Sequence, residues 1–295
     1  MARIDTLANF LTDVATAIKN KTGKTDAITP ANFDTEINSI EAGGGSGSGS
    51  KYAPRYISFY YYTGTELDYE IANLDTSNIT SMKNMFNHCS NLASLEISNF
   101  NTSNVTNMNN MFYYCSALTT IALNNFDTSN ATDMSAMFSN CTALTNVNIP
   151  KLDIKNVTTF RQMFTSCTSL KTLTLSPDFV TTSSMGQNTV ILDNMFAWDS
   201  SLEYLDLSNI IIPSGRVYSC VQMFAGCSSL KHLNLSSIVF AYIQTIGNRW
   251  NGMLDSVPTD CEIIVSSAGD KSWFNTKFPT YTNVKTKAEY EAEQA

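Results

Sequence analysis

The sequence predicts an α/β solenoid of about six to seven repeats, preceded by a separate α-helical segment. Met-Phe pairs recur every 26 residues, beginning at Met85, Met111, Met137 and Met163, and return at longer spacings at Met195 and Met223. Each pair precedes a six-residue phrase with apolar residues at its first, fourth and sixth positions: LASLEI, LTTIAL, LTNVNI, LKTLTL, LEYLDL and LKHLNL. A period in the twenties that carries LxxLxL is the signature of a leucine-rich-repeat solenoid.

Residues 1–42 form the predicted helical segment, which we expect to serve in oligomerisation or attachment. Its apolar positions alternate in spacings of three and four residues and so share one helix face: Ile4, Leu7, Leu11, Val14 and Ile18. Helices this short cannot bury that face alone, which favours self-association or docking on a partner protein. Packing against the rest of this chain is the alternative. Residues 43–51, rich in Gly and Ser, form a flexible linker of natural or engineered origin.

Each repeat within residues 52–270 is expected to contain a short helix and a short parallel strand. The last three residues of the six-residue phrase alternate apolar, polar and apolar, as in a half-buried strand. Upstream, the apolar residues from Val105 to Leu118 are spaced for one face of a short helix, with Thr106 as its cap. Stacked repeats then share one continuous core with end caps, and residues 271–295 add a C-terminal cap and a polar tail.

The cysteines follow the repeat. Cys89, Cys115, Cys141 and Cys167 are 26 residues apart, Cys227 shares their place in the motif, and the fifth repeat has Asp199 there. One cysteine per repeat does not make a CxxC pair, so no metal site is expected. A small buried apolar residue is the favoured role for this position. Disulfides between stacked repeats are the alternative.

Composition and motifs exclude several classes of function. The net charge of -8 and the pI of about 4.7 argue against binding to nucleic acid. No apolar run is long enough for membrane insertion. Of the two histidines, His88 occupies a helix position that varies among the repeats, which indicates a solvent-facing place. We therefore expect no catalytic residues, no metal and no cofactor, and a protein that is not an enzyme.

A candidate ligand-binding face lies on the predicted sheet. The outward positions of the fifth and sixth strands bring together Tyr204, Asp206, His232 and Asn234. An aromatic ring beside carboxylate and amide groups suits a sugar or a peptide, because such ligands take stacking and directional hydrogen bonds. An ordinary solvated sheet face is the alternative.

The phrase LDTSNITSMKNMFNHCSNLASLEISNF resembles the BspA-like leucine-rich repeats of bacterial surface proteins, and the likeness covers about residues 71–236. The segment LANFLTDVATAIKNKTGKTDAITPANFDTEINSI within residues 1–42 resembles an N-terminal segment of tail-associated proteins of phages that infect Gram-positive bacteria.

These resemblances imply a non-enzymatic virion protein of the phage tail, made in the host cytoplasm without a signal peptide. Its expected partners are a host cell-surface carbohydrate or protein, and other virion proteins through the N-terminal helices. A homo-oligomer such as a trimer is expected. Two other readings stay open: a head decoration or fibre protein that coats the particle, and a bacterial surface adhesin.

Overall fold

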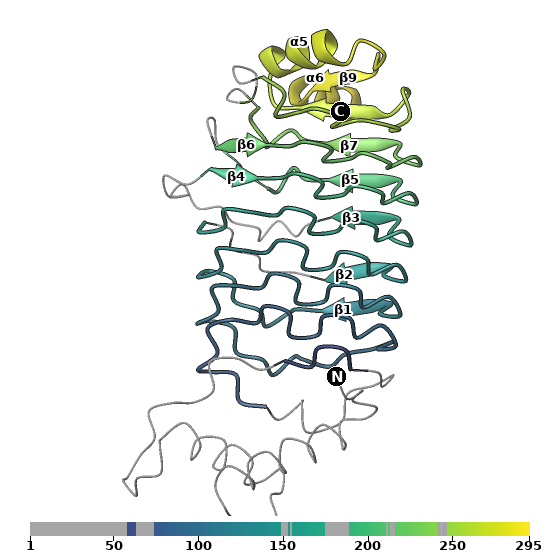
Figure 1. Cartoon of the computed structure of the whole chain (residues 1–295). Coiled ribbons are helices and arrows are strands. Elements are labelled where there is room, and N and C mark those ends of the chain that lie inside the picture. The colour runs from purple at the N-terminus through teal and green to yellow at the C-terminus, as the bar shows by residue number, and fades with distance from the viewer. Residues whose placement is uncertain are drawn as a thin grey trace, which may run out of the picture.

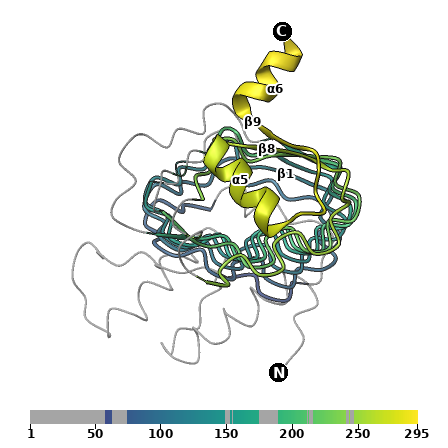
Figure 2. The ribbon, with the colours of Figure 1, turned by 90° about the horizontal axis from the view of Figure 1, so that it is seen from above.

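The computed structural model describes residues 58–62, 74–148, 153, 155–174, 189–210, 212, 216–240, 243 and 247–295. The predicted helical segment of residues 1–42, with its apolar face, and the linker of residues 43–51 lie outside the described residues. The described chain winds into stacked coils, with helices α5 (Ala268–Lys277) and α6 (Lys287–Gln294) at the C-terminal end of the stack (Figure 1). Seen along the stack, the coils superpose into one ring (Figure 2).

Short parallel strands build one side of the stack. The strands are β1 (Thr120–Ala122), β2 (Asn146–Asn148), β3 (Thr172–Thr174), β5 (Tyr204–Asp206), β7 (His232–Asn234), β8 (Glu262–Val265) and β9 (Val284–Thr286). β1 pairs with β2, and the other five form one sheet in the order β3–β5–β7–β8–β9. A separate pair, β4 (Val190–Ile191) with β6 (Val217–Ser219), lies elsewhere on the coils (Figure 1). The predicted solenoid with parallel strands is confirmed.

The predicted short helix of each repeat is wrong, because the Met-Phe segment folds as a series of tight turns. The Met111 N–H donates to the carbonyl of Met108 at 3.2 Å, three residues back, where an α-helix would reach four. The Phe112 N–H donates instead to the carbonyl of Met137 in the next coil, at 2.9 Å. Successive backbone N–H groups thus donate in alternation to a carbonyl of the same turn and to a carbonyl of the neighbouring coil. Thr106 is not a helix cap, since its N–H and hydroxyl both donate to the Thr80 carbonyl.

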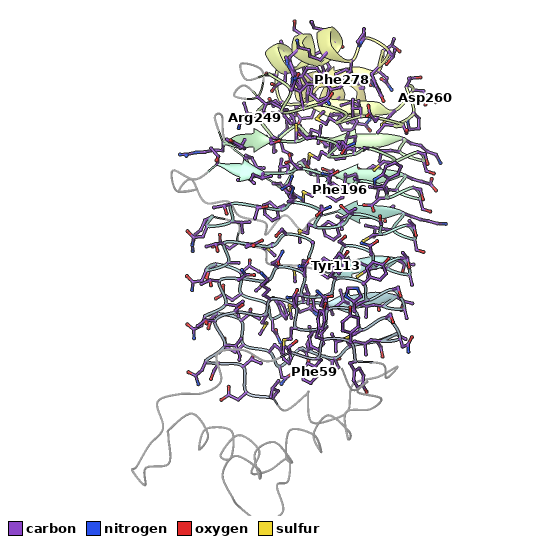
Figure 3. The ribbon with its side chains drawn as sticks, in the orientation of Figure 1. Phe59, Tyr113, Phe196, Arg249, Asp260 and Phe278 are labelled. Atoms are coloured by element: carbon purple, nitrogen blue, oxygen red, sulfur yellow. The ribbon has the colours of Figure 1, made fainter. Side chains whose placement is uncertain are left out.

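Phenylalanine rings stack through the centre of the coils, as Figure 3 shows for the interior side chains. Adjacent rings lie 5.4–5.9 Å apart between centroids and are inclined by 2–11°, in the series Phe59, Phe86, Phe112, Phe138, Phe164, Phe196 and Phe224. Spacings of this size match the separation of neighbouring coils, so one ring per repeat gives a continuous core.

All seven cysteines are buried and free, which agrees with the apolar role expected for this position. Each repeat cysteine donates its thiol to the carbonyl of the phenylalanine one coil earlier, as Cys115 does to Phe86 and Cys141 to Phe112, both at 3.1 Å. Asp199 takes the same place in its coil and is 0 % exposed. One carboxylate oxygen accepts the Cys167 N–H at 2.7 Å, and the other has no hydrogen-bond partner among the described residues.

The C-terminal end of the stack is closed by β8, α5 and β9. Ser267 caps α5 by accepting the Asp270 N–H, and Trp273 and Phe274 of this helix pack against Phe240 of the last coil, 6.1 and 5.7 Å away between ring centroids. The Tyr281 hydroxyl donates to two backbone carbonyls of the stack at 2.8 and 2.9 Å. Neither described helix has the length and hydropathy needed to cross a membrane.

Candidate functional site

The four predicted ligand-binding residues lie on neighbouring strands. The register of β5 and β7 pairs Tyr204 with His232 and Asp206 with Asn234. The Tyr204 and His232 rings stack in parallel, 4.4 Å apart between centroids and inclined by 2°. Tyr204 is 36 % exposed, whereas His232 is 9 % exposed and Asn234 is also buried. Ligand binding by these four residues stays a prediction, with Tyr204 as their most exposed member.

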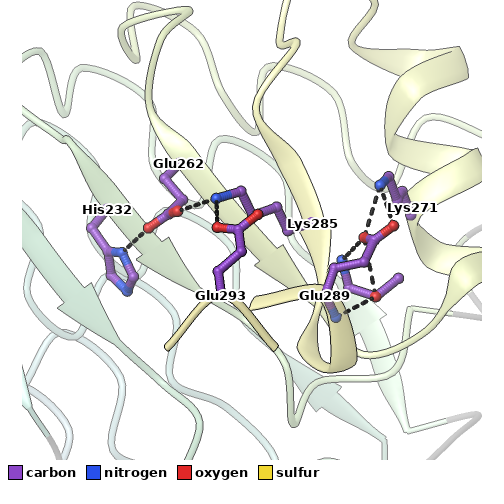
Figure 4. Close-up of polar contacts among 7 residues, drawn as sticks. His232, Glu262, Lys271, Lys285, Glu289 and Glu293 are labelled. Carbon is purple, nitrogen blue, oxygen red and sulfur yellow. Dashed lines mark hydrogen bonds and ion pairs between the residues drawn. The ribbon is translucent and has the colours of Figure 1, made fainter. Parts of the chain in front are cut away.

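The C-terminal cap covers the His232 side of this face (Figure 4). The Glu262 carboxylate contacts Nδ1 of His232 at 2.7 Å and Nζ of Lys285 at 2.9 Å, and Lys285 also pairs with Glu293 of α6. Burial opposes ionisation of Glu262, but the hydrogen bonds from Lys285 and His232 outweigh it and lower the pKa of this carboxyl below its ordinary value. Tyr290 of α6 also lies beside His232, with 5.7 Å between the two ring centroids.

His232 is therefore held in place by its neighbours. Its Nδ1 is bound to a carboxylate, and its Nε2 is buried without a hydrogen-bond partner among the described residues. Among all the residues that the structure describes, no three His, Cys, Asp or Glu side chains are placed to hold a metal ion. The arrangement fixes the cap to the last strands, and the only large exposed ring that it offers a ligand is Tyr204.

A second candidate site lies on the turns, which the sequence had indicated only as solvent-facing positions. One residue of each coil occupies the same turn position and donates its N–H to the carbonyl of the following coil. All have positive φ, between 61° and 80°. We call this set the turn column: Tyr61, His88, Tyr114, Asn140, Ser166, Trp198 and Gly226.

The backbone of the turn column favours residues other than the aromatic ones found there. Left-handed φ is natural for glycine and accessible to asparagine, but bulky side chains adopt it at a cost of order 1 kcal/mol. Asn140 and Gly226 follow this preference, whereas Tyr61, Tyr114 and Trp198 do not. Asn140, Ser166 and Gly226 form the same turn, so an aromatic side chain is not required for this backbone conformation.

These aromatic residues are among the exposed large hydrophobic residues of the described surface. Tyr61 is 52 %, Tyr114 43 % and Trp198 59 % exposed. The His88 ring lies between the two tyrosines: it is tilted by 36° against Tyr61, with centroids 4.7 Å apart, and it stacks on Tyr114 at 5.0 Å with an inclination of 5°. Partial burial lowers the pKa of His88, so the ring is predominantly neutral at neutral pH. The turn column thus presents uncharged rings.

Comparison with known proteins agrees with the repeat architecture. Residues 56–176 match the family described as Mycoplasma protein of unknown function, DUF285, and residues 162–249 match the BspA type leucine rich repeat region. A search of curated proteins gave no significant match.

Three solved structures are similar. A leucine-rich repeat protein from Eubacterium ventriosum is 19 % identical, with 72 % of this chain and 46 % of that chain covered and a TM-score of 0.35. One from Bacteroides ovatus is 15 % identical, with 76 % and 70 % covered and a TM-score of 0.20. A leucine rich cell surface protein from Faecalibacterium prausnitzii is 15 % identical, with 80 % and 87 % covered and a TM-score of 0.21.

The chain spans less than half the length of the Eubacterium protein. The described coils and the two family matches agree. The chain contains a BspA-type leucine-rich repeat region over residues 162–249 and is similar to the Mycoplasma family over residues 56–176.

Proposed function

We propose that this protein is a non-enzymatic, tail-associated phage virion protein whose repeats bind a carbohydrate or protein on the host cell surface. The observation that carries the recognition role is the exposure of Tyr61, Tyr114 and Trp198 at positions where the backbone favours small residues. A solenoid with a continuous core holds these side chains at fixed separations, as a binding surface requires. Aromatic residues of this kind dominate the energetics of recognition surfaces.

The virion location is supported by the likeness of residues 1–42 to the N-terminal segment of phage tail proteins. The apolar face from Ile4 to Ile18 suits assembly of a homo-oligomer such as a trimer, with attachment to other virion proteins. Several copies of the repeat domain on one particle turn a weak contact into strong attachment, because the second contact is intramolecular.

Immunogold labelling of particles with an antibody against residues 51–295 tests the location. Label at the tail tip or baseplate supports the proposal. Label on the head favours a decoration protein that coats the particle, and absence of label from every particle favours a bacterial adhesin. Either of these two results contradicts the tail assignment.

Binding of the fluorescently labelled full-length protein to cells of the Gram-positive host tests recognition. A variant with Tyr61, Tyr114 and Trp198 all changed to asparagine is expected to lose most of the binding, since asparagine suits the left-handed backbone but offers no ring. The Tyr204→Asn variant tests the sheet face in the same assay. Wild-type protein that binds no host envelope contradicts the recognition role.

A further inference from the structure

We infer that the turn column binds a neutral glycan, with Tyr114 and Trp198 as its aromatic platforms and Asn140 and Ser166 between them. The inference rests on the proposed recognition function and names its site and its ligand class. It also places the contact on the turns, away from the sheet face that carries Tyr204 and His232.

Trp198 is seated on a glycine that leaves room for its indole. A Cβ atom at Gly226 would lie 2.6 Å from Cε3 of Trp198, closer than real Cβ atoms come to other atoms, and 3.0 Å from Cδ2. The indole therefore packs directly against the backbone of the following coil. With 59 % of the residue exposed, the ring keeps a large open surface on a firm support.

Tyr114 offers a ring face from the opposite direction. His88 covers the face of Tyr114 that looks toward the N-terminal coils, since the two rings are stacked 5.0 Å apart and nearly parallel. The other face of Tyr114 is turned along the stack, toward the coil of Asn140. The column residues after it, Asn140 and Ser166, carry no ring that could stack on that face as His88 does on the first.

Three coil steps separate the two platforms. The N–H groups of Tyr114, Asn140 and Ser166 donate to the next coil at 2.9, 2.8 and 2.9 Å. Hydrogen-bonded neighbours lie about 4.8 Å apart, so the backbones of Tyr114 and Trp198 are separated by roughly 14 Å. This span accommodates a short run of sugar rings. Between the platforms, the Asn140 amide and the Ser166 hydroxyl are groups that pair with sugar hydroxyls.

The chemistry of the turn column favours a glycan over a protein partner. Sugar rings present C–H groups that pack on the faces of aromatic rings, and their hydroxyls match amide and hydroxyl side chains. From Tyr114 to Gly226 the column contains no charged residue, although the chain carries a net charge of -8. The rings are separated by polar positions along one line, whereas a protein interface needs a broad buried patch.

Tryptophan fluorescence gives a direct test with the full-length protein. Trp250 and, on α5, Trp273 pack against each other, 5.9 Å apart between ring centroids, and neither belongs to the column, so a change caused by a ligand on the column is assigned to Trp198. The probes are chitotetraose, cellotetraose, maltotetraose and the neutral polysaccharide purified from the wall of the host that binds the protein. At least one probe is expected to shift the emission saturably.

Two substitutions define the site. Isothermal titration calorimetry measures binding of that probe to each variant, because the fluorescence signal arises at Trp198 itself. Trp198→Asn and Tyr114→Asn are each expected to weaken binding of that probe by roughly tenfold or more. Trp198→Tyr, which keeps a ring, should retain most of it, and Tyr218→Ala removes an exposed ring away from the column and should leave it unchanged. Thermal unfolding checks that each variant is folded. Normal binding by both asparagine variants, or no response to any probe, overturns the inference.

Treatment of the host cells separates this inference from the proposed function. Periodate cleaves the vicinal diols of sugars, and protease removes surface proteins. Binding that is lost after periodate and survives protease supports the glycan. Binding that survives periodate and is lost after protease overturns the glycan while recognition of the host surface stands.

Discussion

Replacing Asp199 by asparagine is expected to raise the stability of the protein relative to wild type, by an amount that grows with pH. The side chain is 0 % exposed, and one of its carboxyl oxygens has no hydrogen-bond partner in the part of the chain that the structure describes. Burial raises the pKa of Asp199 well above its ordinary value, and the hydrogen bond from the Cys167 N–H only partly opposes this shift. Folding therefore favours the protonated carboxyl.

The sign of the pH dependence follows from the raised pKa. Below the pKa of the unfolded state, both states hold the proton and the residue contributes nothing. Above it the unfolded chain ionises while the folded carboxyl stays protonated, so wild-type stability falls by about 1.4 kcal/mol per pH unit until the folded pKa is reached. Asparagine has no proton to lose and shows no such fall.

Urea unfolding of the two proteins at pH 4, 5, 6 and 7 measures this effect. The other titratable groups are common to both, so the change of the difference with pH belongs to Asp199. Asp75→Asn is the matched control of opposite sign, because hydrogen bonds from Ser77 lower the pKa of Asp75 and its stabilising contribution is lost as pH falls. A difference between wild type and Asp199→Asn that stays constant from pH 4 to 7 would refute the reasoning.

Three further predictions concern the packing of the stack. Gly226→Ala should destabilise the protein by about 1–3 kcal/mol in urea unfolding, because φ is +80° and the new Cβ meets the Trp198 ring; an equal loss in a Trp198→Gly background would contradict that contact. Phe138→Ala removes one ring from the phenylalanine stack and should cost about 3–5 kcal/mol, whereas a loss under 1 kcal/mol would show that neighbouring coils close the gap. Burial raises the pKa of Cys141 to about 12, so we expect no reaction of the native thiols with Ellman's reagent at pH 8 and release of all seven after unfolding; rapid labelling of native protein would contradict their burial.

The repeat period was sufficient to predict the stack, but not the local conformation of its turns. Residues such as Leu118 and Phe112 recur once per repeat and are buried in every described coil, so the core followed from spacing alone. The spacing of three and four residues is shared by a helix and by consecutive tight turns. What decides between them is the positive φ of residues such as Asn110 and Tyr114, together with hydrogen bonds to the next coil. Those bonds depend on a neighbour that a single repeat does not contain.

For the candidate sheet face, too, the repeat pattern predicted which residues are neighbours but not what covers them. Alternation along β5 and β7 correctly placed Tyr204 beside His232. The polar C-terminal sequence gave no sign that Tyr290 and Glu262 would come to rest against His232, because those contacts are made by a cap that follows the repeats. Tyr204 lies on β5, which is separated from β8 by β7, and it is the most exposed of the four predicted residues.

Departures from the repeat have different consequences inside and outside the stack. Asp199 departs inside, where one carboxyl oxygen accepts the Cys167 N–H and the other has no hydrogen-bond partner among the described residues. Trp198, the residue before it, departs outside, and its indole is accommodated because the next coil has Gly226 at the same position. Two linked departures in adjacent coils, one that exposes a ring and one that makes room for it, are unnecessary for a turn that Asn140 and Ser166 form without either. The pairing of Trp198 with Gly226 therefore supports a binding role of the turn column in addition to the exposure of its rings.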